Sequence, residues 1–215
     1  MLYVHIGLSR SELLDEMRFF LLAGFETTST ALAWFIHLMS KHPQVQEKIK
    51  AELRSDGHQG SLSLDRLDAL VYLDCVIKEV FRFSPPVNGT VRTVTVNDRL
   101  PESGTELFQG DQILIPFHNL ARDARYWSID PNIFSPERFL GPDKDHHLYA
   151  WIPFGHGHRQ CIGQDLARFE LKVIAATLMQ HVTFGDGGDK VNAGGHVSKL
   201  TIMPKHVGVT IDFDQ

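Results

Sequence analysis

The sequence predicts an α+β fold that is mostly α-helical and has small β-sheets. The first part of the chain shows long helical periodicity with start and stop signals, whereas the middle and the end carry short β-branched stretches between turn residues. The 215 residues are 43% hydrophobic and 22% charged, which is typical of a globular protein that can bury a core without disulfides or metals.

The first helix is predicted to begin after Ser9 and to continue until Pro43 stops it. Ser9 and Glu12 have the spacing of a capping box, and an unusually long apolar run follows them. Its segment Phe19–Met39 is also a membrane candidate, but Glu26 at the centre would cost about 2.5–3.5 kcal/mol in a bilayer. We therefore expect a long buried helix. The residues before Ser9 lack a basic head, so no signal peptide is expected.

Two further helices are predicted before the chain changes period. The segment Pro43–Arg54 opens on a proline, in the first-turn position that proline tolerates. The segment Val71–Phe83 has helical periodicity and is ended by Pro85 and Pro86.

The middle of the chain predicts a pair of strands and then an irregular segment. Thr90–Val96 is β-branched and alternating, Asn97-Asp98 is a turn signal, and Gln112–Ile115 is a second strand. From Asp123 to Gln160 the chain has four prolines and no long periodic segment. An irregular stretch of that length inside a compact domain is usually functional.

The end of the chain predicts one helix, a loop and two weak strands. The helix covers roughly Gly163–His181, and the glycine-rich stretch Gly185–Gly195 is expected to be a loop. Ser198–Ile202 and Val207–Phe213 are the two strand candidates.

Charge and cysteine usage restrict the function classes. The formal net charge is −5 and no basic stripe is interleaved with aromatic residues, so no nucleic-acid partner is expected. Two cysteines, Cys75 and Cys161, are too few for a disulfide framework, which indicates a reducing compartment or thiols kept for chemistry. Cys75 lies among apolar residues of a predicted helix and is expected in the core.

The strongest chemical signal surrounds Cys161, in Phe154-Gly155-His156-Gly157-His158-Arg159-Gln160-Cys161-Ile162-Gly163. Two glycines permit a tight turn that brings the backbone close to a flat ligand, and a cysteine at the start of a helix is favoured as a thiolate, the form that binds metals. A lone cysteine is more often a small buried hydrophobe. The pattern Phe154-x-x-Gly157-x-Arg159-x-Cys161-x-Gly163, however, resembles the heme-ligand signature of the cytochrome P-450 family, the heme-thiolate monooxygenases.

A second match lies on the long helix. Ala23-Gly24-Phe25-Glu26-Thr27-Thr28 resembles the oxygen-activating motif of that family. Thr27 can return its hydroxyl to the carbonyl of Ala23, which bends or opens a helix, and an opened turn beside a carboxylate can hold water and relay protons. Without the cysteine turn, a buried helix with satisfied hydroxyls would be preferred.

A third match joins two distant segments. Glu79 and Arg82 face the same way on a helix, and an exposed pair of this kind contributes only about 0.2–0.5 kcal/mol. Pro136-Glu137-Arg138-Phe139 resembles the family segment whose arginine joins them. The resemblance implies a buried network of Glu79, Arg82 and Arg138 that fixes the irregular stretch before the cysteine.

The resemblance also implies the cofactor contacts. Cys161 would be the metal ligand, holding the iron of heme b (iron-protoporphyrin IX) as an axial thiolate, and Phe154, Gly155 and Ala23 would line the cofactor. Arg159 and Arg92 would pair with heme propionates, because guanidinium geometry suits carboxylates. The alternative for Arg92 is a surface strand arginine. Many family members carry histidine where this chain has Ala121, so that contact is lost here.

The function implied is monooxygenation of a small hydrophobic organic substrate, with one atom of O2 entering the substrate. Glu26 and Thr27 would be the catalytic residues that deliver protons through water. Electrons would come from NADPH or NADH through a flavoprotein reductase or an iron–sulfur partner. Arg168 and Lys172, one turn apart, are candidates to face an acidic reductase, and a solvated helix face is the alternative.

The matched motifs assign residues 1–215 to a partial P-450 domain, its C-terminal half, with the N-terminal helical portion expected to be absent. A full-length microsomal-type relative would lie in the endoplasmic reticulum membrane, although neither an anchor nor a signal is expected in this chain. The alternative function is a truncated, catalytically inactive heme-fold remnant. A zinc site is a distant third; its candidate ligands are His146, His147, His156, His158 and Cys161.

Overall fold

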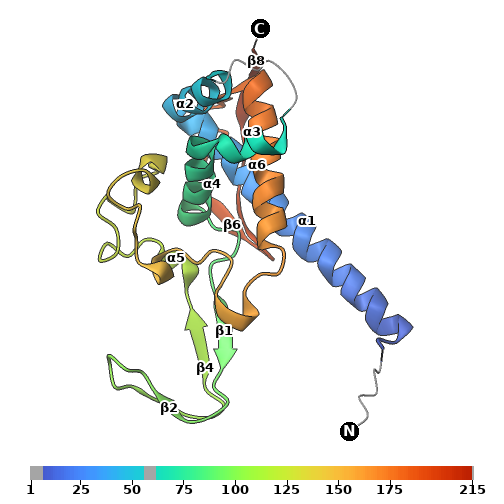
Figure 1. The fold of residues 1–215 in the computed structure, drawn as a ribbon, viewed down its shortest axis with the longest axis vertical. Coiled ribbons are helices and arrows are strands. Elements are labelled where there is room, and N and C mark those ends of the chain that lie inside the picture. Colours follow the sequence, from blue (N-terminus) through green and yellow to red (C-terminus); the bar gives the residue numbers. More distant parts are fainter. Residues whose placement is uncertain (1–6, 56–61, 215) are drawn as a thin grey trace.

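A computed structural model of the chain describes residues 7–55 and 62–214. It confirms the α+β class: long helices form the body, and the strands within the described residues form four two-stranded antiparallel sheets (Figure 1). The core lies where helices α1 (Arg10–Lys41), α2 (Pro43–Arg54), α4 (Val71–Phe83) and α6 (Gln164–His181) pack together. Its most deeply buried apolar side chains include Phe35, Ile49, Leu73, Leu171 and Met179.

Helix α1 begins with the predicted capping box and ends just before Pro43. The Ser9 hydroxyl accepts from the backbone N–H of Glu12, and the Glu12 carboxylate accepts from the backbone N–H of Ser9 at 2.7 Å. The expected burial applies only to its second half, which contains Phe35; residues 10–22 are exposed and extend beyond the body in Figure 1. Within the described residues, α1 is the one helix long and apolar enough to cross a membrane.

Helix α4 has the predicted bounds, but its N-terminus is capped from another helix. The Glu52 carboxylate of α2 accepts from the backbone N–H groups of Tyr72 at 2.6 Å and Leu73 at 3.0 Å. The short helix α3 (Leu64–Ala69), begun by Ser63, was not predicted. Because free N–H groups at a helix start need acceptors, Glu52 fixes how α2 and α4 meet.

Of the two predicted central strands, the first is shorter than predicted and the second has the predicted bounds. Strand β1 (Thr90–Thr93) pairs antiparallel with β4 (Gln112–Ile115). The chain then bends, and β2 (Asp98–Arg99) pairs with β3 (Glu106–Leu107), so the predicted strand to residue 96 and the predicted turn at residues 97–98 are both wrong. The side chain of Asn97 accepts from the backbone N–H of Gln109 at 2.8 Å, so it uses a donor that a continuous ladder would pair with a backbone carbonyl.

The strands at the end also differ from the prediction. Strand β5 (Val182–Asp186), which was not predicted, pairs with β8 (Val209–Phe213). The loop predicted at Gly185–Gly195 therefore begins only after Asp186. Strand β6 (His196–Ser198) pairs with β7 (Ile202–Pro204). The segment 198–202, predicted as one strand, therefore contains the connection of a hairpin, residues 199–201, between the last residue of β6 and the first of β7.

The segment from residue 123 to 160 is irregular, as predicted. It follows the short helix α5 (Phe117–Leu120) and contains only turns and three 3₁₀ segments, Pro136–Phe139, Leu148–Ala150 and Gly157–Arg159. It leads directly into the turn before α6.

Candidate active site

Cys161 lies on a tight turn three residues before α6 begins, with its thiol exposed. Gly155 and Gly157 adopt left-handed backbone with φ of 74° and 72°, a conformation that favours glycine. The backbone N–H of Cys161 donates to the carbonyl of Phe154 at 2.8 Å and closes the turn. The predicted turn is confirmed, and it presents the sulfur outward.

Aromatic packing fixes this turn against α4. The ring of Phe154 meets the ring of Phe81 edge to face, with centroids 4.9 Å apart. On the other side of the cysteine, Ile162 is 86% exposed and Leu166 is 61% exposed. The turn therefore combines a rigid base with apolar side chains that are free to cover a ligand.

The two predicted propionate partners, Arg159 and Arg92, have no carboxylate partner among residues 7–55 and 62–214. Arg159 is exposed on the cysteine turn. Arg92 is half-buried on β1 and donates to the Thr90 hydroxyl at 2.7 Å and to the Val91 carbonyl at 2.9 Å. Both cations are thus available to an anionic group.

On α1, the predicted hydroxyl–carbonyl bond is confirmed, because Thr27 Oγ1 donates to the carbonyl of Ala23 at 2.8 Å. The helix is nevertheless continuous from Arg10 to Lys41, so the predicted opening of a turn is not seen. A Cβ added at Gly24 would meet no atom within 4 Å, which shows that packing among the described residues does not require glycine there.

Glu26 has a partner that was not predicted. Its Oε1 accepts from the hydroxyl of Thr201 at 3.0 Å, and that hydroxyl also bonds the hydroxyl of Thr30 at 2.8 Å. Glu26 and Thr201 are 175 residues apart, and Thr201 lies in the hairpin connection misinterpreted as a strand. No local pattern could have indicated this contact.

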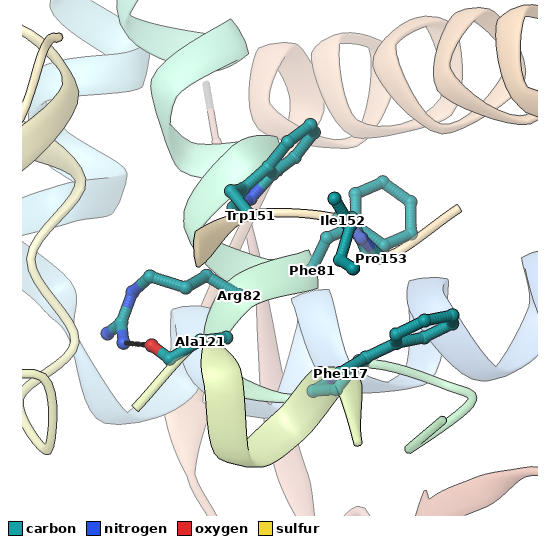
Figure 2. A pocket seen from close by; sticks show the side chains of 8 residues that line it. Phe81, Arg82, Phe117, Ala121, Trp151, Ile152 and Pro153 are labelled. Carbon is teal, nitrogen blue, oxygen red and sulfur yellow. Dashed lines mark hydrogen bonds between the residues drawn. The ribbon is translucent and has the colours of Figure 1, made fainter. Parts of the chain in front are cut away.

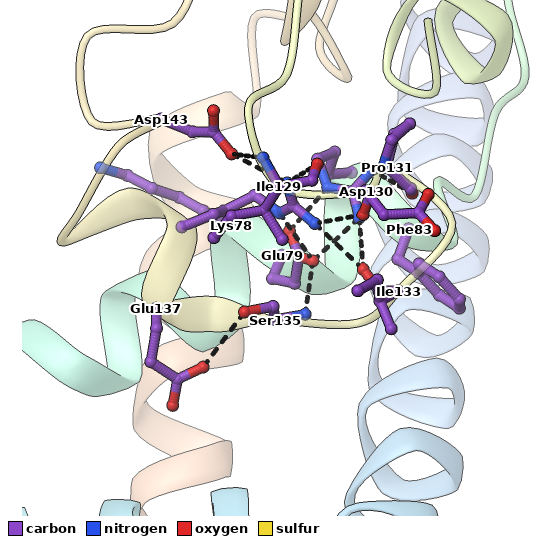
Figure 3. Close-up of polar contacts among 12 residues, drawn as sticks. Lys78, Glu79, Phe83, Ile129, Asp130, Pro131, Ile133, Ser135, Glu137 and Asp143 are labelled. Carbon is purple, nitrogen blue, oxygen red and sulfur yellow. Dashed lines mark hydrogen bonds and ion pairs between the residues drawn. The ribbon is translucent and has the colours of Figure 1, made fainter. Parts of the chain in front are cut away.

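The predicted network of Glu79, Arg82 and Arg138 is confirmed, and all three side chains are fully buried. Figure 3 shows the polar contacts around Glu79. Arg82 donates to both carboxylate oxygens of Glu79, at 2.7 and 2.8 Å, and Arg138 Nε donates to Glu79 Oε1 at 3.1 Å. The backbone N–H of Ser135 adds a further bond to Glu79 at 2.8 Å.

Asp143 is a fourth member that was not predicted. It accepts from Arg138 at 3.0 Å and from the backbone N–H groups of Ser128 and Ile129. Burial alone would raise the pKa of Asp143, but these donors outweigh it and lower the pKa. The remaining guanidinium N–H groups bind backbone carbonyls, those of Ala121, Ile129, Asp130, Pro131 and Ile133.

A small hollow lies beside Arg82 and the segment that leads into the cysteine turn (Figure 2). Ala121 borders it, and the Arg82 guanidinium bonds the carbonyl of Ala121 at 2.9 Å. The hollow does not admit a water-sized molecule, so it cannot take an organic substrate. Its lining consists of Phe81, Arg82, Pro85, Phe117, Ala121, Trp151, Ile152 and Pro153.

The zinc alternative finds no support. In the described part of the chain no three His, Cys, Asp or Glu side chains lie close enough to hold a metal ion. His146 instead stacks on Trp127 at 5.2 Å, and His156 meets Tyr149 edge to face at 5.4 Å. Cys75 is 4% exposed, in the core as predicted.

The prediction that Arg168 and Lys172 of α6 face an acidic reductase is wrong for Lys172. Lys172 is buried and forms an ion pair with Asp74 of α4 at 2.8 Å, so it holds two helices together instead of facing a partner. Arg168 lies over the ring of Trp151 at 5.9 Å.

Comparison with known proteins assigns this arrangement to a family. The model for "Cytochrome P450" matches residues 4–208. The chain is 34% identical over 200 residues to putative cytochrome P450 132 of Mycobacterium tuberculosis, covering 92% of this chain and 42% of that protein. It is 34% identical over 171 residues to cytochrome P450 4A10 of Rattus norvegicus, covering 79% and 33%. It is also 34% identical over 208 residues to putative cytochrome P450 CYP13A10 of Caenorhabditis elegans, covering 95% and 40%.

The chain belongs to the cytochrome P450 family, as its motifs predicted. It spans between 33% and 42% of the length of these three relatives. Membership supports a monooxygenase-type function in general and implies a heme cofactor. The residues present fit that group: one exposed thiol on a rigid turn, apolar neighbours, and two arginines without carboxylate partners among the described residues.

Proposed function

We propose that this chain is the C-terminal, heme-binding portion of a heme-thiolate monooxygenase, in which Cys161 would hold the iron of heme b as a thiolate. The observation that carries the proposal is the exposed thiol, held by the bond from Cys161 N–H to the Phe154 carbonyl at 2.8 Å. An exposed cysteine ahead of a helix is accessible as a thiolate ligand, whereas the buried Cys75 is not.

The residues around the thiol would hold the flat ring and its carboxylates. Phe154, Gly155 and Ala23 would contact the ring. Arg159 and Arg92 would neutralise the propionates with charge-assisted hydrogen bonds. The arginine–glutamate network would keep the segment before the cysteine in place.

Heme bound here would supply the redox chemistry that activates O2. The chain's own contribution is proton delivery from α1. Thr27 donates its only hydroxyl hydrogen to the Ala23 carbonyl, so the Thr27 oxygen is left to accept a hydrogen bond from water. Glu26, one residue before it, would supply the proton to that water.

The substrate would be a small hydrophobic organic molecule. Electrons would come from NADPH or NADH through a flavoprotein reductase or an iron–sulfur protein. For the whole protein, if it is of the microsomal type, we expect a location at the endoplasmic reticulum membrane.

The ligand assignment is tested by the spectrum of the reduced carbon-monoxide complex after adding heme to the purified chain. The unchanged chain and Cys75→Ala should give the thiolate-type band, and Cys161→Ser should lose it. A thiolate-type band that persists in Cys161→Ser would remove the basis of the proposal.

A second candidate is a heme-fold remnant that binds heme without turning over substrate. The small hollow beside the cysteine turn and the exposed N-terminal half of α1 favour it. Normal heme uptake without any substrate-dependent consumption of NADPH in the presence of a reductase would select this candidate.

A further inference from the structure

The carboxylate of Glu26 is held by a hydroxyl from the other end of the chain. Thr201 Oγ1 lies 3.0 Å from Glu26 Oε1 and 2.8 Å from Thr30 Oγ1, and the two threonines are 1% and 2% exposed. The Thr201 hydroxyl donates to Glu26, so its single hydrogen is used in that bond. Thr30 must therefore donate to Thr201, so the two hydrogen bonds run from Thr30 to Thr201 and from Thr201 to Glu26.

Thr201 itself has little freedom to move. The next residue, Ile202, uses both of its backbone polar groups: its N–H donates to the Pro86 carbonyl at 2.8 Å, and its carbonyl accepts from Trp34 Nε1 at 2.7 Å. The Thr201 carbonyl accepts from the backbone N–H of Lys199 at 2.9 Å. The hydroxyl is thus fixed by α1, by the segment after α4 and by the hairpin.

We propose that Thr201 is a positioning residue for Glu26, a role that rests on the proposed function. The bond from Thr201 occupies Glu26 Oε1, while Oε2 accepts no hydrogen bond from the part of the chain that the structure describes. A half-buried carboxylate fixed at one oxygen keeps the other in a constant direction, where it can exchange a proton with water. Without Thr201 the carboxylate would sample several rotamers, and the proton donor would lose its preorganisation.

A purely structural role for Thr201 predicts a different pattern of variant effects. If Thr201 only fastens the hairpin to α1, its important partner is Thr30, and removing either hydroxyl should have the same effect. If Thr201 positions Glu26, the two variants should differ. Thr30→Val is therefore the matched control, because it removes the bond between the threonines and keeps the donor to Glu26.

The first readout does not require heme. Infrared difference spectra between the chain with ¹³C-labelled glutamate and its Glu26→Gln variant isolate the Glu26 carboxylate band. The exposed Glu47, isolated through Glu47→Gln, serves as the solvated reference. We expect a narrow Glu26 band distinct from the Glu47 band. Thr201→Val and Thr201→Ala should move it to the Glu47 position, whereas Thr201→Ser and Thr30→Val should not.

The second readout is the fraction of NADPH electrons that reaches product in the heme-loaded chain. Thr201→Val should lower it about fivefold, the factor equivalent to one hydrogen bond of about 1 kcal/mol, and Thr201→Ser should restore it. A Glu26 band that is unchanged in Thr201→Val, or moved equally by Thr30→Val, overturns the inference whatever the activity. Absence of heme binding would instead count against the proposed function, since the infrared result stands without it.

Discussion

The two cysteines show how environment separates chemistry from packing. Cys75 lies on α4 at 4% exposure, and burial raises the pKa of its thiol, which keeps it protonated and inert. Cys161 is exposed on a turn that two left-handed glycines make possible. Only the second can reach a ligand outside the chain.

At the residue scale, Thr27→Ala should leave heme bound but divert reducing equivalents to peroxide. In the proposed function the Thr27 oxygen accepts from water beside Glu26, so its loss should reduce coupling of NADPH use to product by roughly tenfold or more. Product and peroxide are measured together. Thr177→Ala is the control, since Thr177 makes the same hydroxyl-to-carbonyl bond, at 2.8 Å to Val173, on the exposed side of α6. Unchanged coupling in Thr27→Ala would refute the proton-delivery role.

Asp143→Asn should destabilise the chain by about 3 kcal/mol or more at neutral pH, because it removes a charge from a buried network. The pKa of Asp143 is lowered on folding, so its contribution is fully present above the unfolded value of about 3.9 and is lost as pH falls through the folded value. The difference from the unchanged chain should therefore shrink below about pH 4. Urea unfolding at several pH values measures it, with exposed Asp145→Asn as the control. A difference that is constant across pH would contradict this assignment.

At the element scale, the start of α4 depends on a residue of α2. Glu52→Ala should lower the free energy of unfolding by about 1–2 kcal/mol, since two backbone N–H groups at a helix N-terminus lose a charged acceptor. Glu47→Ala, on the exposed face of the same helix, should change it by less than about 0.5 kcal/mol. Equal effects in urea titrations would show that Glu52 does not cap α4.

Signals confined to neighbouring residues predicted the elements well. Ser9 with Glu12, and then Pro43, marked both ends of α1, and the cysteine turn was predictable because its determinants lie within ten consecutive residues. Strand β5 was missed because it follows α6 with no breaker between them. The Glu52 cap and the Glu26–Thr201 bond were missed because they depend on how distant elements pack, which no local pattern encodes.

At the scale of the whole molecule, the exposed half of α1 is an apolar surface. Met17 is 61% exposed and Leu21 is 72% exposed, and exposed apolar surface of this kind drives association. The 215-residue chain should self-associate as its concentration rises, and Met17→Lys with Leu21→Lys should weaken this. Phe108→Lys with Leu114→Lys, which follow β3 and lie in β4 respectively, adds the same charge elsewhere and is the control. Sedimentation that is equal for both double variants would argue against α1 as the associating surface.

The hydrogen bonds from α1 to the hairpin also set an order of assembly. Thr30 and Thr201 are 171 residues apart, and Trp34 and Ile202 are 168 apart. Contacts of such long sequence separation form late, because closing the loop costs conformational entropy before the contact contributes any stabilisation. During synthesis, the cysteine turn can fold while the hairpin is still inside the ribosome. The Glu26 carboxylate acquires its Thr201 partner only after the hairpin has emerged.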